Sequence, residues 1–288
     1  MAGRKDMKIM RKTMGKKAFL FTLGMLLVTL AILSFAKFVS EESGNEKGFF
    51  QMAAITNRLD DADSSLQRSI ADVFILHSGI EVSTGNHSIV FEEPLPNDAG
   101  GFASGLARLK RFAEANDTTV HIDTNETVSE IPLFILPQNT VYRHNFSNRE
   151  ILVALPGDPN SSIIRYKTTL TIPENVSCSW DYDPGHFSYQ LDVISPKESG
   201  CDSTKQVSLA DNAMITIASQ KSPSNRIYLS LNRDSISIKM DDAGTFNIST
   251  KSEITFYSAP GGVWLGNGTV EIRFDEFNLK KKGGVRII

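Results

Sequence analysis

The sequence predicts an α+β protein: an N-terminal transmembrane helix and an amphipathic stalk helix, followed by an antiparallel β-sandwich-like extracytoplasmic domain. Three observations lead to this prediction. Residues 18–36 carry no charge, residues 45–77 repeat apolar side chains at helical spacing, and short β-branched and aromatic runs follow Asn116. We expect five segments: a basic cytoplasmic segment (1–17), a transmembrane helix (18–38), a linker and stalk helix (39–78), a small mixed α/β lobe (79–150) and the sandwich (151–288).

Residues 18–36 have the composition of a membrane-spanning helix. They are apolar on every face, and at about 1.5 Å per residue they span about 28 Å, close to the hydrocarbon core of a bilayer. Residues 1–17 hold seven Lys or Arg against one Asp, which predicts a cytoplasmic N-terminus and an exported C-terminal part. The alternative is a signal peptide cleaved after Ala36, although the apolar run is longer than usual for one. Either way the same domain is exported.

Sequons for N-linked glycosylation give independent support for export. The pattern N-x-S/T occurs eight times, always after the apolar stretch. A domain rich in Ser, Thr and Asn would also produce some of these tripeptides by composition alone. The candidate glycosylation sites are Asn86, Asn116, Asn125, Asn145, Asn160, Asn175, Asn247 and Asn267.

The chain has two cysteines, Cys178 and Cys201, both in the part expected outside. An even pair in an oxidising compartment predicts one disulfide, with two buried free thiols as the alternative. There is no C-x-x-C motif and no pair of histidines at zinc-finger spacing, so we expect no structural zinc site.

The stalk helix is expected to bury one stripe of side chains against its own chain. A coiled-coil dimer is the alternative, although about three heptads is short for one. Charged residues, including Asp60 and Asp63, are expected on the solvated side, and a second short helix is expected to end near Asn116. The apolar stripe comprises Met52, Ile55, Leu59, Ala62, Leu66, Ile70 and Val73.

After Asn116 the pattern is typical of strands. Residues 234–239 and 245–249 alternate between polar and apolar side chains. Many short strands separated by turn signals indicate an antiparallel sandwich. Lys280, Lys281 and Lys282 are expected in a solvated turn before a final strand. The turn signals include Pro156-Gly157, Pro184-Gly185, Pro223, Gly244 and Pro260-Gly261-Gly262.

One cluster carries residue types suited to chemistry. Asp181 and Asp183 stand two apart with His186 nearby, and such a set could bind a divalent cation. In this membrane topology the D-x-D resembles metal-dependent glycosyltransferases of secretory membranes. The simpler interpretation is a Pro-Gly turn with solvated carboxylates, so we predict no catalytic residue, metal or cofactor. No Walker loop or G-x-S-x-G elbow occurs, and the net charge of −3 gives no basic field for nucleic acid.

A family resemblance follows from the N-terminal region. Basic residues are followed by Gly15-Lys16-Lys17-Ala18-Phe19-Leu20-Phe21-Thr22-Leu23, one apolar helix, an amphipathic continuation and a β-rich head. This plan resembles type IV pilin-like proteins, most of all the single-pass pilin-like and archaellum-associated surface proteins of archaea. The resemblance covers residues 10–75 as sequence and the remainder as architecture. It implies a surface structural or adhesive subunit without enzymatic activity.

These observations together predict a non-enzymatic, membrane-anchored cell-surface protein. It would act as a pilin-like subunit, adhesin or envelope-complex component, through protein or glycan contacts. The alternative is an exported glycan-active hydrolase or metal-dependent transferase that uses Asp181, Asp183 and His186.

Overall fold

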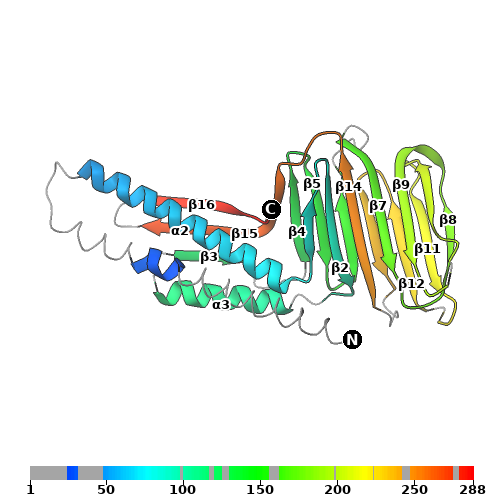
Figure 1. Ribbon diagram of the computed structural model, residues 1–288, viewed down its shortest axis with the longest axis horizontal. Coiled ribbons are helices and arrows are strands. Elements are labelled where there is room, and N and C mark those ends of the chain that lie inside the picture. Colours follow the sequence, from blue (N-terminus) through cyan, green and yellow to red (C-terminus); the bar gives the residue numbers. More distant parts are fainter. Residues whose placement is uncertain are drawn as a thin grey trace, which may run out of the picture. The chain divides into compact units, whose positions relative to one another are not determined.

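The computed structural model describes residues 25–31, 48–97, 100–116, 120–124, 130–155, 162–197, 199–222, 224–241, 247–274 and 279–288 (Figure 1). Residues 25–31 are helical. The expected basic segment, residues 1–17, and the rest of the expected transmembrane helix lie outside the described residues. No helix within these ranges is long and apolar enough to cross a membrane.

The chain divides into two compact units that are interleaved in sequence. The first unit comprises Met1–His77, Gly101–Glu126 and Asn267–Arg286. The second comprises Ser78–Gly100, Thr127–Gly266 and Ile287–Ile288. Residues 79–150, which we expected as one lobe, contribute to both units.

The first unit contains two helices, α2 (Gly48–His77) and α3 (Gly100–Asn116). The predicted stripe of α2 is confirmed where its side chains are described, since Leu59, Ala62, Leu66, Ile70 and Val73 are buried. The rings of Phe74 and Phe102 pack edge to face, with centroids 5.7 Å apart. A Cβ atom at Gly105 would lie 2.7 Å from Cγ1 of Val73, so this glycine allows the two helices to approach closely.

An ion-pair cluster holds α2 to strand β16 (Leu279–Arg286). Nζ of Lys281 lies 2.8 Å from Oδ1 of Asp60 and 3.0 Å from Oδ2 of Asp63. The expectation of a solvated Asp63 and of Lys281 in a turn is therefore wrong: Asp63 is only 2% exposed, and Lys281 lies within the strand. The hydrogen bond to Asp60 is the largest cause that raises the pKa of Lys281. The buried carboxyl group is tolerated because an ammonium group and the side-chain amide of Gln67 both bond to it.

The second unit is β-sandwich-like, and the α+β class is confirmed at this level. Its six-stranded sheet has the strand order β1-β2-β14-β7-β9-β10 (Figure 1). These strands are β1 (Glu81–Thr84), β2 (Ser88–Leu95), β7 (Ile163–Thr171), β9 (Pro184–Ile194), β10 (Ser203–Val207) and β14 (Ile248–Phe256).

The ten-stranded sheet has the order β16-β15-β4-β5-β6-β13-β12-β11-β8, and β3 also pairs with β15. The part of β15 that pairs with β4 belongs to the second unit, whereas the part that pairs with β3 belongs to the first. The remaining strands are β3 (Val120–Thr124), β4 (Glu130–Leu136), β5 (Thr140–Asn145), β6 (Glu150–Ala154), β8 (Val176–Asp181), β11 (Ala213–Ser219), β12 (Arg226–Leu231), β13 (Ser235–Met240) and β15 (Gly262–Phe274).

One pair of strands departs from the antiparallel pattern that the sequence predicts. β7 and β9 run parallel, whereas the other ladders described are antiparallel. The reason is the path of the chain: between β7 and β9 it crosses to the ten-stranded sheet as β8 and then returns. A strand that returns after such a crossover lies parallel to the strand it left.

The core of the second unit follows from the alternation of side chains along the strands. In β13, Ile236 and Ile238 are buried, which confirms the strand predicted at 234–239. The largest buried side chains in these sheets are aromatic: Phe91, Tyr142, Tyr166, Tyr189 and Phe256.

Candidate functional site

The candidate acidic cluster spans the end of β8 and the start of β9, where the chain passes from the ten-stranded to the six-stranded sheet; Asp183 lies between the two strands and His186 lies within β9. Asp181 is the last residue of β8, and the side chains of Asp181, Asp183 and His186 are all exposed. The carbonyl of Asp183 accepts a hydrogen bond from the N–H of Ser208, 2.8 Å away. A Cβ atom at Gly185 would lie 2.3 Å from that nitrogen, so the tight approach needs glycine.

In the described ranges, no three His, Cys, Asp or Glu side chains are grouped so that they could hold a metal ion. The predicted turn at Pro184-Gly185 is wrong, because both residues begin strand β9, whereas the carboxylates of Asp181 and Asp183 are exposed as expected.

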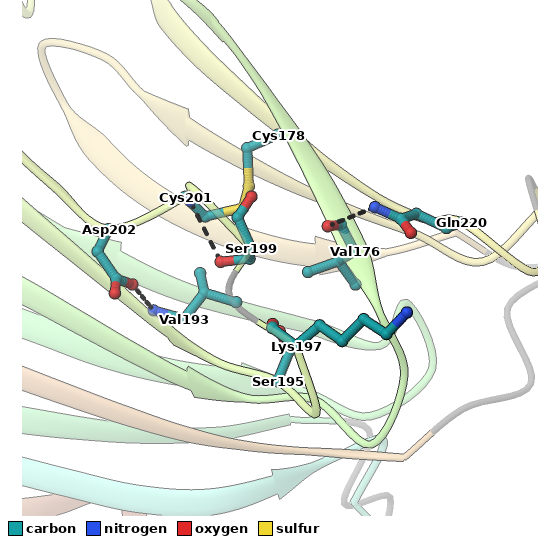
Figure 2. Close-up of a disulfide and its surroundings, with 9 residues drawn as sticks. All are labelled: Val176, Cys178, Val193, Ser195, Lys197, Ser199, Cys201, Asp202 and Gln220. Carbon is teal, nitrogen blue, oxygen red and sulfur yellow. Dashed lines mark hydrogen bonds between the residues drawn. A yellow bond between two sulfur atoms is a disulfide. The ribbon is translucent and has the colours of Figure 1, made fainter.

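The disulfide predicted between Cys178 and Cys201 is present (Figure 2). It connects β8 of the ten-stranded sheet to the segment that leads into β10 of the six-stranded sheet. Around it, Oδ1 of Asp202 accepts a hydrogen bond from the N–H of Val193 at 2.6 Å, as Figure 2 shows. The bridge therefore joins the edge strands of the two sheets covalently.

An aromatic group lies beside the disulfide. The ring of Trp180 packs edge to face with Tyr182 at 6.0 Å and with Tyr189 at 6.4 Å, centroid to centroid. Nζ of Lys205, on the neighbouring edge strand β10, lies 5.6 Å from the ring centroid of Tyr182, within cation–π range. Trp180, Tyr182 and Lys205 are half-buried, whereas Tyr189 is fully buried.

The interior of the second unit contains a polar cluster that the sequence analysis did not single out. The carboxyl group of Glu93 on β2 bonds to the hydroxyl of Tyr142 and to Nδ1 of His144, both on β5. The side chains of Glu93 and His144 are completely buried. Burial, followed by the neighbouring Glu93, raises the pKa of Tyr142. Because the side chains of Glu93 and His144 are buried, we interpret these hydrogen bonds as stabilising the packing of one sheet on the other.

A second buried hydroxyl group lies in the same interior. The O–H of Tyr166 donates a hydrogen bond to Oγ of Ser252 at 2.9 Å. Burial raises the pKa of Tyr166 to about 12 and raises that of Tyr189 further, so both stay protonated at neutral pH.

Sequence alternation could have identified the buried carboxyl group. In Ser88–Leu95 every second residue points inward, namely Ile89, Phe91, Glu93 and Leu95. A glutamate in such a series needs a buried partner. The partner could not be predicted, because it lies on a strand of the opposite sheet.

The outer face of the six-stranded sheet is strongly charged. Cross-strand ion pairs join Lys251 to Glu92, Arg165 to Glu253 and Lys167 to Asp192, the last at 2.6 Å. The hydrogen bond from Lys167 is the main cause that lowers the pKa of Asp192. Strongly hydrated charges of this kind are depleted at the centres of protein interfaces.

The outer face of the ten-stranded sheet carries an apolar group that we call the β4 patch: Phe134, Leu136, Val141 and Trp264. Phe134 lies directly opposite Val141 on β5 and Trp264 on β15. Phe134 and Leu136 are each 39% exposed. A Cβ atom at Gly266 would lie 2.4 Å from the Phe134 ring, so this glycine makes room for the ring on the sheet. Neighbouring exposed apolar side chains of this kind mark interaction surfaces.

The described residues define a disulfide-bridged β-sandwich with one charged and one partly apolar outer face. Comparisons with protein-family models, with curated proteins and with solved structures gave no match. The resemblance to pilin-like surface proteins therefore stays a prediction.

Proposed function

We propose that this chain is a non-enzymatic, membrane-anchored cell-surface protein that acts through protein or glycan contacts. Residues 18–38 would anchor it in the lipid bilayer, with the N-terminus in the cytoplasm and the sandwich outside. Its role would be that of a pilin-like subunit, an adhesin or a component of an envelope complex. No cofactor and no nucleic acid are part of this proposal.

The observation that carries the proposal is the disulfide between Cys178 and Cys201. Disulfides persist in oxidising compartments outside the cytosol and are rare inside it. The unequal charge on the two sides of residues 18–36 supports the same placement independently. The side chains of Asp181, Asp183 and His186 are exposed, and their arrangement adds no support to the alternative of a glycan-active enzyme.

The topology can be tested by cysteine labelling in intact cells. Ser83 is exposed on the edge strand β1. We expect Ser83→Cys to react with a membrane-impermeant maleimide in intact cells, because the sandwich would face outward. The control variant Ala2→Cys should react only after permeabilisation. Labelling of Ser83→Cys only in permeabilised cells would reverse the topology.

Polar substitution tests whether the β4 patch is the surface that contacts a partner. The double variant Phe134→Ser with Leu136→Ser is treated with a lysine-reactive cross-linker in intact cells. We expect the fraction of the protein that becomes cross-linked to other surface components to fall several-fold. The physical reason is the loss of apolar area that a partner would cover.

A matched control lies on the other sheet. Ile164 and Ile194 are 43% and 57% exposed on β7 and β9, so their replacement by serine removes comparable apolar area. This control variant should cross-link as the wild type does. Equal loss in both variants, or no loss in either, would contradict a role for the β4 patch.

A further inference from the structure

The sequons differ in the exposure of the acceptor asparagine: Asn86 and Asn247 are exposed, whereas Asn175 is half-buried with a buried amide oxygen. We infer that Asn86 and Asn247 accept an N-linked glycan and that Asn175 does not. This inference rests on the proposed export of the sandwich. Asn125 and Asn160 lie outside the described residues, and the side chains of Asn116 and Asn267 are not described.

Asn86 lies in the turn between β1 and β2, where both it and His87 are exposed. The turn is closed by a hydrogen bond from the N–H of Gly85 to the carbonyl of Ser88, at 2.8 Å. The N–H of Phe256 donates to the carbonyl of His87, also at 2.8 Å. A well-held turn therefore presents the side chain of Asn86 to solvent, where a transferase can reach it.

Asn247 stands immediately before β14. In its sequon Asn247 and Ser249 are exposed, whereas Ile248 between them is only 3% exposed. Side chains two apart on a strand lie on the same face. The acceptor amide and the hydroxyl that the sequon requires therefore both face outward.

Asn175 lies in a different environment, directly before β8. The residue as a whole is half-buried, as Asn145 is, but its Oδ1 is buried and has no hydrogen-bond partner in the described part of the chain. Its main chain is hydrogen-bonded to Gln220, whose N–H donates to the carbonyl of Asn175 at 2.9 Å. The side-chain amide of Gln220 donates to the carbonyl of Val176 at 3.3 Å, as Figure 2 shows. The glycan would be attached to Nδ2, which shares a carbon atom with the buried Oδ1, so its first sugar would lie against the protein that covers this oxygen.

Asn145 does not separate the two classes. Its side chain is half-buried at the end of β5, and its Oδ1 accepts a hydrogen bond from the N–H of Asn148 at 3.0 Å. The inference therefore assigns Asn86 and Asn247 as glycan acceptors and Asn175 as a site without a glycan.

The modification needs a lipid-phosphate-linked oligosaccharide as the donor. Nδ2 of the asparagine attacks the anomeric carbon, and a carbon–nitrogen bond forms as the bond from that carbon to the phosphate oxygen breaks. The lipid phosphate leaves with the electron pair, and Nδ2 loses one proton to a base of the transferase. The asparagine amide must therefore be accessible both to the anomeric carbon of the donor and to the base of the transferase.

The two acceptor sites lie at opposite ends of one sheet. Asn86 precedes β2 and Asn247 precedes β14, and these strands are antiparallel neighbours. At about 3.4 Å per residue, the eight residues of β2 separate the two ends by roughly 25 Å. Glycans there would flank the charged outer face of the six-stranded sheet, the face opposite to the one that carries the β4 patch.

Removal of the sequon serine tests each site without altering the asparagine. The variants Ser88→Ala, Ser249→Ala and Ser177→Ala each remove one hydroxyl; Ser249 and Ser177 are exposed, and Ser88 is half-buried. The full chain is purified from membranes of its own cells and its intact mass is measured. We expect Ser88→Ala and Ser249→Ala each to lose the mass of one glycan beyond the oxygen atom, and Ser177→Ala to lose only the oxygen.

The outcomes separate this inference from the proposed function. Loss of a glycan in Ser177→Ala overturns the inference, as does unchanged glycan mass in Ser88→Ala or Ser249→Ala. If Ser83→Cys labels in intact cells while these variants lose no glycan, export holds and the site assignment is wrong. If Ser83→Cys does not label in intact cells, the proposed export fails and the inference falls with it.

Discussion

Replacement of His144 by leucine is expected to lower the free energy of unfolding of the second unit by about 3 kcal/mol. Leucine is similar in size to histidine but apolar, so the substitution removes the imidazole group whose Nδ1 bonds to Glu93. Removing one partner of a fully buried pair costs roughly 3–5 kcal/mol, because the remaining polar group stays buried without that partner and without water to replace it. Urea unfolding followed by tryptophan fluorescence measures the change, since Trp180 and Trp264 both belong to the second unit.

A triple variant distinguishes a lost pair from a packing defect. Glu93→Met, Tyr142→Phe and His144→Leu together replace the carboxyl group and its two partners on β5 by apolar side chains of similar volume. The amide of Asn97, which also donates to Glu93 at 3.5 Å, keeps its hydrogen bond to the carbonyl of Ser78 at 2.9 Å. Its stability should return close to that of the wild type, because apolar replacement of a whole buried polar cluster is often neutral. A triple variant no more stable than His144→Leu alone would show that the loss comes from packing. Lys251→Ala, which breaks an exposed ion pair, should cost less than about 1 kcal/mol.

Removal of the disulfide by Cys178→Ser with Cys201→Ser is expected to lower the free energy of unfolding by about 3 kcal/mol. The bridge closes a loop with a sequence separation of 23 residues, and the chain-entropy relation gives about 3 kcal/mol for a loop of that length. The unfolded chain gains freedom when the bridge is absent, whereas most of the folded contacts remain. The same fluorescence-detected urea unfolding measures the change.

A reductant supplies the control for this variant. Dithiothreitol should lower the stability of the wild type to that of the double variant and leave the double variant unchanged. If reduction is complete by mass and the wild type keeps its stability, the bridge does not contribute through loop closure. If the reductant also destabilises the double variant, the effect does not arise from the disulfide.

Local periodicity explains the parts of the fold that the sequence predicts. The three-to-four spacing from Leu59 to Val73 is visible without knowledge of any partner, and these side chains are buried as expected. The alternation at residues 234–239 likewise predicts β13, and two cysteines allow only one pairing within the chain. The cluster of Asp181, Asp183 and His186 was visible as a motif, but the motif did not show that Pro184 and Gly185 begin a strand.

Long-range pairing explains the rest. Lys281 meets Asp60 across 221 residues, and Glu93 meets His144 across 51, so no window of sequence contains both partners. The parallel pair β7–β9 arises because β8 joins the other sheet, a choice that the side chains of β8 alone do not specify.

By itself the sequence determined the apolar stripe of α2, the strand at residues 234–239 and the pairing of the two cysteines, because these depend on residues close together in the chain or on a single possible pair. Only the tertiary structure decided that Asp63 is buried, that Glu93 joins the two sheets, and that Asn86 and Asn175 differ in exposure. The reason is physical: whether a polar group is buried and satisfied depends on which distant strand packs against it.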